Sequence, residues 1–325
     1  LISASPGPFR AIRTFAWHDQ LGYLSMVANV ANGDLENPEP VTQTGVNHYP
    51  RAYYTAVGLV ARGLGVAPIT AWNLTSALFQ LAAVSALALC LARVSRRPWA
   101  AFFAPLPFFT GVMSAVDPGN TLWYRPLESH AVLWGPYGVM FSNNAETAGL
   151  SVIVFAFSMV AAVWLRPTPR GLRVGISIAA AAVLGALSSF QTYSFLTGAY
   201  VAAFTIAAMF LAAPGRKWWL VATGLTVPVL FIFGPSVSAA AGQLPTLVFG
   251  LLPALPGLVR GLLRTRGFLA IYGIVFALAA APQIVWTLSG VVSGDPFLSY
   301  RVASNVDLGV VRIGTLIAST AVVAP

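Results

Sequence analysis

Long apolar runs without charged residues recur along the chain, and they constrain its fold more than any other feature. A helix needs on the order of 20 such residues to cross the hydrocarbon core of a bilayer. Runs of about this length cover 69–92, 98–116, 148–165, 174–190, 192–212, 218–233, 268–292 and 308–324. Hydrophobic residues make up 57% of the chain and charged residues 8%, which excludes a water-soluble globular domain. Barrels would show short alternating segments, so the predicted fold class is all-α, a polytopic transmembrane helix bundle.

The charged residues predict which connections face the cytoplasm. Basic residues cluster in alternate connections, as expected for cytoplasmic loops, and no acidic residue accompanies them. These clusters are Arg93, Arg96 and Arg97; Arg166, Arg170 and Arg173; Arg216 and Lys217; and Arg260, Arg264 and Arg266. The acidic residues all fall in the other connections: Asp19, Asp34, Glu36, Glu39, Asp117, Glu128, Glu146, Asp295 and Asp307. One assignment of sides explains both lists, with the acidic residues outside.

A weaker apolar segment at 246–259 decides the number of spans. It is short and contains Pro253 and Pro256, so a kinked or tilted helix is expected. The alternation of basic clusters requires this segment to cross, which gives about nine spans. The same alternation places residues 1–68 outside, so one further span is expected before residue 1.

The predicted domains are an outer loop, residues 1–68, and a transmembrane bundle, residues 69–325, with a second outer loop at 117–147. Helical spacing of apolar residues predicts two amphipathic helices lying along the membrane interface, at 17–31 and 50–64. In the first, Trp17, Leu21, Leu24 and Val27 or Ala28 recur at helical spacing, and a turn at Asn32-Gly33-Asp34 would follow it. The second loop is rich in aromatic residues, which is typical of an interface belt, with stacking on sugars or lipid tails as the alternative.

Metal and nucleic-acid chemistry find little support in the sequence. Cys90 is the only cysteine and lies in an apolar run, so no disulfide framework or Cys-based metal site is expected. The spacing of His18, His48 and His130 matches no established metal motif, so no metal ligand is assigned, and a divalent ion stays an open alternative. The net charge of +9 comes from basic residues at the ends of apolar runs, which argues against nucleic-acid binding.

Carboxylates just outside a span are the best candidates for chemistry, because ionisable groups at membrane depth usually need a function or a partner. Asp19 is the first, at the start of the first predicted interfacial helix. The alternative is a structural role, since a carboxylate in the first turn of a helix is stabilised by the helix dipole.

The layout resembles the GT-C class of membrane glycosyltransferases over roughly residues 15–212. The shared features are an early acidic residue in the first outer loop, two interfacial helices, the stretch His48 to Tyr54 leading into the next span, and short basic inner loops. The resemblance implies that Asp19 acts as the general base on an acceptor hydroxyl and that the sugar comes from a polyprenyl-phosphate carrier. A carboxylate within hydrogen-bond reach can take the proton of such a hydroxyl.

The same resemblance implies a second acidic residue in the second outer loop, where Glu128 and Glu146 compete. Glu146 is favoured because it lies nearer the membrane surface, and a solvated or helix-capping carboxylate is the alternative for both. The carrier phosphate needs donors at the outer surface, and a guanidinium group offers two parallel hydrogen bonds. The predicted substrate- or phosphate-binding residues are His18, His48, Arg51, His130, Tyr300 and Arg301.

The sequence therefore predicts a multi-pass glycosyltransferase of the bacterial inner membrane, with its active side periplasmic and a role in cell-wall biogenesis. It would move a hexosyl or pentosyl group from a polyprenyl-phosphate donor to a glycan or lipid-linked acceptor. A transporter or lipid flippase is the first alternative, disfavoured because the predicted spans contain almost no ionisable residue and no internal repeat. A non-catalytic scaffold of an envelope-synthesis complex is the second alternative.

Overall fold

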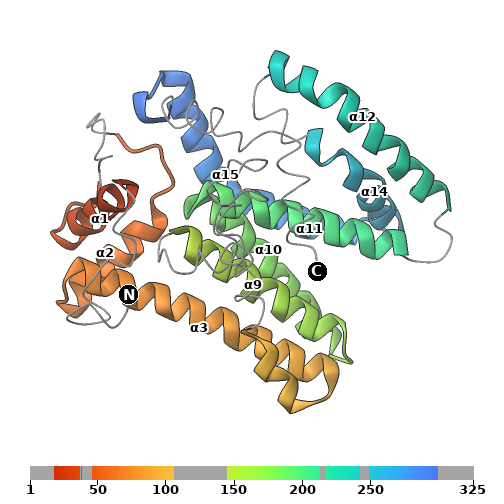
Figure 1. Ribbon diagram of the computed structural model, residues 1–325, viewed down its shortest axis with the longest axis horizontal. Coiled ribbons are helices and arrows are strands. Elements are labelled where there is room, and N and C mark those ends of the chain that lie inside the picture. Colours follow the sequence, from red (N-terminus) through yellow and green to blue (C-terminus); the bar gives the residue numbers. More distant parts are fainter. Residues whose placement is uncertain are drawn as a thin grey trace, which may run out of the picture. The chain divides into compact units, whose positions relative to one another are not determined.

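A computed structural model describes residues 18–36, 38, 46–105, 145–212, 217–241 and 249–298 (Figure 1). This part of the chain is all-helical and contains no strand, which confirms the all-α part of the predicted fold class. Five of its helices are long and apolar enough to cross a membrane, which indicates a membrane protein. They are α3 (Pro68–Ser95), α9 (Ala145–Trp164), α10 (Arg170–Ala186) continued by the 3-10 turn η4 (Leu187–Ser189), α11 (Thr192–Ala212) and α15 (Phe268–Ser293).

These five helices coincide with the predicted spans at 69–92, 148–165, 174–190, 192–212 and 268–292. The predicted span at 218–233 lies within α12 (Lys217–Ala241), a helix of 25 residues. The start of the predicted span at 98–116 is the 3-10 helix η2 (Pro98–Phe103), and its remainder beyond residue 105 lies outside the described residues. The predicted span at 308–324 also lies outside them.

The weak segment at 246–259 does not form one spanning helix in its described part. The 3-10 turn η5 (Leu252–Ala254) is followed by α14 (Leu255–Arg264), which has only 10 residues. At 1.5 Å per residue such a helix is about 15 Å long, half of the hydrocarbon thickness. Pro253 and Pro256 each lie in the first turn of one of these short helices, where a missing N–H costs nothing. The predicted count of nine spans is therefore not confirmed.

The chain divides into two compact units. The described part of unit 1 contains α1 (His18–Ala31), α2 (Ala52–Leu64), α3, η2, α9, α10, η4, the start of α11 up to Leu196, and α15 from Val275 onward. The described part of unit 2 contains the remainder of α11 and α15 with α12, η5 and α14. All of the geometry described below for the candidate site belongs to unit 1.

The two helices predicted in the first outer loop are present as α1 and α2. The predicted turn follows α1, where Gly33 has φ of +103° and the Asp34 N–H donates to the Asn29 carbonyl. Of the α1 residues at the predicted spacing, Val27 is buried and Leu24 packs against the core, whereas Leu21 is 61% exposed; Met26 and Val30 are buried as well. Their orientation relative to a membrane stays a prediction.

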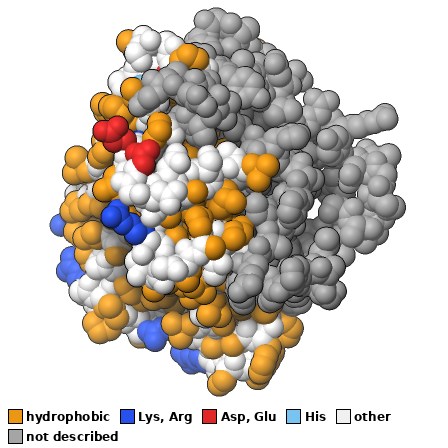
Figure 2. Space-filling view, turned by 90° about the vertical axis from the view of Figure 1, so that its left-hand side faces the viewer, with side chains coloured by type: hydrophobic (Ala, Val, Ile, Leu, Met, Phe, Trp, Pro, Cys, Tyr) orange, Lys and Arg blue, Asp and Glu red, His pale blue; other side chains and the backbone are white. Residues whose placement is uncertain are grey.

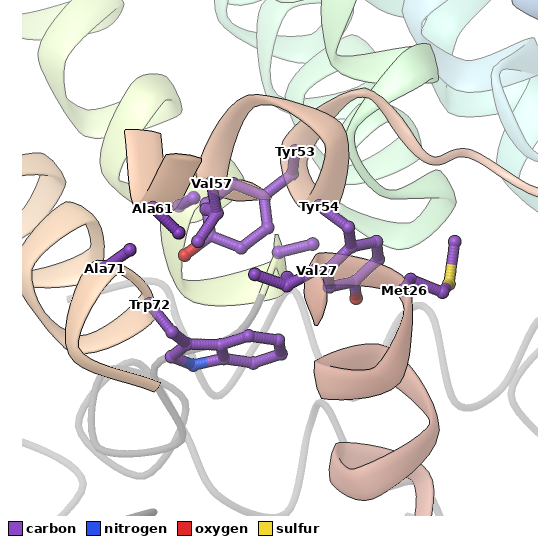
Figure 3. Close-up of a cluster of buried hydrophobic side chains, with 10 residues drawn as sticks. Met26, Val27, Tyr53, Tyr54, Val57, Ala61, Ala71 and Trp72 are labelled. Carbon is purple, nitrogen blue, oxygen red and sulfur yellow. The ribbon is translucent and has the colours of Figure 1, made fainter. Parts of the chain in front are cut away.

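An aromatic core joins α1 and α2 to the starts of α3 and α9. Its buried residues are Met26, Val27, Tyr53, Tyr54, Val57, Ala61, Ala71, Trp72, Ala145 and Ala148. Figure 3 shows the Trp72 indole of α3 below Tyr53 and Tyr54 of α2, with Met26 and Val27 of α1 beside them. The predicted loop helices are therefore packed on the spanning helices through a shared core.

Helices α3 and α9 run parallel within unit 1. At the end where both finish, Arg93 Nε donates to the Ala162 carbonyl at 2.9 Å, and Arg166 donates to the carbonyls of Arg93 and Val94. At the end where both begin, Ala71 and Trp72 share the aromatic core with Ala145 and Ala148. We call the end where both helices finish, which includes residues 93–97 and 164–173, the arginine end. We call the end where both begin the loop end. In the described part of the face shown in Figure 2, hydrophobic side chains are widespread and the acidic side chains lie above the basic ones.

Candidate functional site

Asp19 lies in the first turn of α1, directly after its first residue, His18. This is the position in a helix where the backbone dipoles stabilise a carboxylate. The side chains of both residues lie outside the described part of the structure. Glu128, His130, Tyr300 and Arg301 also lie outside the described residues.

Glu146 lies in the first turn of α9, at the loop end of unit 1. Its backbone carbonyl accepts a hydrogen bond from Ser194 Oγ of α11 at 3.3 Å. Its neighbours Ala145, Thr147 and Ala148 are fully buried, while Glu146 itself is half-buried. The favoured second carboxylate is thus held at the end of unit 1 that faces away from the arginine end.

Arg51 directly precedes α2 and connects the start of this helix to the segment that follows α1. Its Nη1 donates to the backbone carbonyl of Glu36. The side chain of Asp34 accepts the Glu36 N–H at 3.1 Å, so the same short segment is held from both sides. This contact gives Arg51 a structural role in addition to the phosphate-binding role predicted for it.

His48 pairs with an acidic residue that the sequence only assigned to the outer side. The His48 Nδ1 atom lies 2.7 Å from Oδ2 of Asp295, which follows the C-terminal end of α15. The other carboxylate oxygen, Oδ1, accepts the backbone N–H groups of Phe297 at 2.8 Å and Leu298 at 3.2 Å. The Asp295 side chain is 4% exposed and the His48 side chain 12% exposed. Both groups are thus fixed near the surface of the loop end.

The backbone before α2 is hydrogen-bonded to one side of α15. Gln283 Nε2 and Thr287 Oγ1 donate to the His48 carbonyl at 3.2 and 3.0 Å. Trp286 Nε1 donates to the Asn47 carbonyl at 2.9 Å, and its ring lies 4.6 Å from the His48 imidazole, centroid to centroid. We call His48, Asp295, Gln283, Trp286, Thr287 and Gly290 the His48 site.

Gly290 allows α15 to approach the imidazole closely. A Cβ atom at this position would lie 2.5 Å from His48 Cγ and 2.7 Å from Leu298 Cδ1, closer than packed atoms allow. The imidazole therefore lies between the backbone of α15, the Trp286 ring and the Asp295 carboxylate.

Stacked tyrosines connect the His48 site to the aromatic core. Tyr49 meets Phe297 edge to face at 5.5 Å and stacks on Tyr23 at 6.0 Å, with their hydroxyl oxygens 3.2 Å apart. Tyr23 in turn stacks on Tyr54 at 4.8 Å with an interplanar angle of 8°. Such ring pairs contribute specific geometry as well as buried area, so the segment that contains His48 is rigidly supported.

Deeper in the core, Tyr53 is buried and its hydroxyl lies 2.8 Å from Ser76 Oγ of α3. Burial raises the pKa of Tyr53, because desolvation disfavours the phenolate. Tyr53 is therefore a neutral hydrogen-bonding group that joins α2 to α3.

His48 could be predicted from the sequence, but the residues that form hydrogen bonds with it could not. Asp295 lies 247 residues away in the chain, so no local motif links the two. A weaker signal was present in α15, where Gln283 and Thr287 are polar, four residues apart and hence on one face of an otherwise apolar helix. Polar side chains at that spacing indicate a face that meets another polar segment.

Chemically, the His48 site is an imidazole oriented by a carboxylate, next to an indole that is 42% exposed. Among the described residues no cluster of three or more His, Cys, Asp or Glu side chains could hold a metal ion. Comparison with protein-family models, with curated proteins and with solved structures found no match for this chain.

Proposed function

We propose that the chain is a membrane glycosyltransferase that moves a sugar from a polyprenyl-phosphate carrier to a cell-envelope acceptor on the outer face of the bacterial inner membrane. The observation that supports this most is the difference between the two ends of unit 1. Glu146, the His48 site and the helix that contains Asp19 all pack around the loop end, whereas arginines bind the helix carbonyls at the other end.

The reaction requires a base near the outer surface. An acceptor hydroxyl is a poor nucleophile, and a carboxylate can remove its proton as the new C–O bond forms at the anomeric carbon. The bond from that carbon to the phosphate oxygen breaks at the same time, and the polyprenyl phosphate leaves with the electron pair. In this proposal Asp19 is the base, and Glu146 or Glu128 is the second carboxylate.

The fold suits a substrate that is part lipid and part sugar. The spanning helices offer apolar surface to a polyprenyl tail, while the loop end offers hydrogen-bonding groups where the carrier phosphate would reach the membrane surface. Arg51 belongs to this end, and its guanidinium is of the kind that binds phosphate through paired hydrogen bonds. His18, His130, Tyr300 and Arg301 stay predicted contributors to the same site.

The test is transfer of label from radiolabelled polyprenyl-phosphate hexoses and pentoses by the purified protein. Asp19→Asn keeps the size of the side chain but cannot take a proton, so turnover should fall by roughly 10²- to 10⁴-fold with unchanged thermal stability. Asp34→Asn is the matched control in the same loop, because Asp34 is exposed and Asn can also accept the backbone hydrogen bond from Glu36. Equal activity of the Asp19 and Asp34 variants would rule out Asp19 as the base. Absence of transfer by the wild-type protein from every donor would count against the function itself.

A further inference from the structure

We infer that the His48 site binds a hydroxyl group of the sugar substrate through His48 Nε2, with Asp295 as the positioning residue and the Trp286 ring as the adjoining apolar surface. This inference deepens the proposed function and rests on it for the identity of the substrate. It also narrows the role expected for His48, from binding of substrate or phosphate to a contact with a sugar hydroxyl.

The hydrogen bond to Asp295 determines what His48 offers to a ligand. An ionised carboxylate has only acceptor atoms, so the proton in the 2.7 Å contact belongs to His48 Nδ1. In the neutral imidazole the other nitrogen, Nε2, then presents a lone pair. A lone pair accepts a hydrogen bond from a hydroxyl and repels the acceptor-only oxygens of a phosphodiester.

Asp295 is itself held so that it cannot turn away from His48. Its Oδ1 accepts two backbone N–H groups, from Phe297 and Leu298, which leaves Oδ2 directed at the imidazole. Its side chain is almost completely buried, whereas the imidazole retains some exposed surface. This is the arrangement by which a carboxylate fixes both the tautomer and the ring plane of a histidine.

The Nε2 atom has no hydrogen-bond partner among the residues that the structure describes, although the backbone carbonyl and the ring of His48 both make close contacts. Its carbonyl accepts from Gln283 and Thr287, and its ring contacts Trp286 and packs closely on Gly290. A polar atom placed this rigidly and left without a partner in the described part of the chain is available to a ligand. The partly exposed Trp286 ring beside it is suited to the apolar face of a sugar.

The positioning role of Asp295 can be tested without any enzyme assay. Diethyl pyrocarbonate acylates the unprotonated nitrogen of imidazoles, and mass spectrometry measures its rate at each histidine of the full-length protein. In Asp295→Asn the amide NH₂ can donate to Nδ1, which moves the proton to Nε2. Acylation of His48 should then slow by about tenfold or more, while His18 and His130 serve as internal controls with unchanged rates. Asp295→Glu retains a carboxylate and should restore part of the rate, and an unchanged rate in Asp295→Asn would overturn the positioning role.

Protection from the same reagent identifies the ligand chemistry. A simple glycoside such as methyl mannoside or methyl arabinofuranoside should slow acylation of His48 in the wild-type protein, and farnesyl phosphate, which lacks a sugar, should not. Protection by farnesyl phosphate alone would overturn the hydroxyl assignment in favour of a phosphate site. Failure of both probes to protect His48 would also overturn it.

Kinetics separate this inference from the proposed function once transfer is detected. His48→Phe keeps an aromatic ring beside Trp286 but removes the Nε2 acceptor together with the Nδ1–H donor to Asp295, so KM for a substrate should rise about tenfold with kcat within threefold. Asp19→Asn should instead lower kcat. A His48→Phe variant that loses kcat by 10²-fold at unchanged KM would show that His48 takes part in the chemistry, and the binding role would be wrong. Asp295→Asn gives a second variant if His48→Phe lowers the melting temperature.

Discussion

At the scale of single residues, unit 1 joins its helices through polar groups that are paired inside an apolar environment. Tyr53 to Ser76 links α2 to α3, and His48 to Asp295 links the segment before α2 to the end of α15. A buried hydrogen bond contributes little net stability, but a buried polar group without its partner is costly. Each pair therefore favours one arrangement of its helices over others that would bury the same apolar area.

Tyr53→Phe tests the contribution of the buried hydrogen bond between Tyr53 and Ser76. Loss of the hydroxyl should destabilise the protein by about 1 kcal/mol at neutral pH, seen as a lower melting temperature in detergent. Tyr49→Phe, whose hydroxyl is only half-buried, is the control and should cost less.

The stability difference between the wild-type protein and Tyr53→Phe should depend on pH. Burial raises the pKa of Tyr53 above its unfolded value near 10, so its contribution to stability is complete below about pH 10 and is lost as pH rises through the folded pKa. Tyr53→Phe lacks this loss. The difference in melting temperature between wild type and variant should therefore shrink between pH 8 and pH 10.5, and a difference that grows would contradict the burial of a neutral Tyr53.

At the scale of helices, small residues set where two elements approach closely. In membrane helices such contacts replace the hydrophobic effect as a source of specificity. A Cβ on Gly149 of α9 would lie 2.4 Å from both Cβ and Oγ of Ser194 in α11, and one on Gly58 of α2 would lie 2.5 Å from Val30 Cβ in α1. Both helix pairs therefore depend on a missing side chain.

Gly149→Ala should force α9 and the start of α11 apart and destabilise the protein by roughly 1–3 kcal/mol, the usual cost of overpacking. Gly175→Ala in α10 is the matched control, because nothing lies within 4 Å of a Cβ there. Alanine favours the helix by up to about 1 kcal/mol relative to glycine, so the control should be neutral or stabilising. Equal melting temperatures for the two variants would contradict the close contact.

Sequence patterns predicted the helices better than their contacts. Apolar length alone found the regions of α3, α9, α10, α11 and α15, since membrane thickness imposes it. Periodicity predicted the buried face of α1 in part. Val27 is buried and Leu24 packs on the core, but Leu21 is exposed, because the face that packs depends on the partner, where Gly58 makes room for Val27 and Val30. At 246–259, the alternation of basic clusters required a span, but the described part of this segment, which contains Pro253 and Pro256, forms short helices.

The candidate site shows the same limit. Position beside apolar runs, together with the resemblance to GT-C glycosyltransferases, was enough to select His48, Arg51 and Glu146 as candidates. Asp295 could be assigned to the outer side by charge alternation, but its pairing with His48 depends on how α15 packs on the first loop. That packing depends on Gly290 and Trp286, whose roles are visible only in three dimensions.

At the scale of the whole molecule, the arrangement of α3 and α9 agrees with the predicted alternation of sides. The two helices are parallel, so the intervening chain has to return from the arginine end to the loop end, as a span at 98–116 would allow. At the arginine end, Arg93 of α3 donates to a carbonyl near the end of α9, and Arg166, which follows α9, donates to a carbonyl at the end of α3. This is compatible with basic residues gathering on one side of a membrane.

Cysteine labelling of intact cells tests this topology. In a Cys90→Ser background, Asp34→Cys should react with a membrane-impermeant maleimide from outside, and Arg170→Cys should react only after the membrane is opened. Cys90 is buried, so its removal should leave the pattern unaffected. Labelling of positions 34 and 170 from the same side would disprove the map.

The pairing of His48 with Asp295 also bears on the order in which the protein matures during synthesis. A ribosome adds 247 residues between the two side chains, which takes on the order of tens of seconds at typical elongation rates. By then α1, α2, α3 and α9 have all left the ribosome and can assemble their common core, while His48 still lacks its carboxylate. The last of the described helices to be translated thus completes the His48 site, so a nascent chain released before α15 would lack Gln283, Trp286 and Asp295 and could not form it.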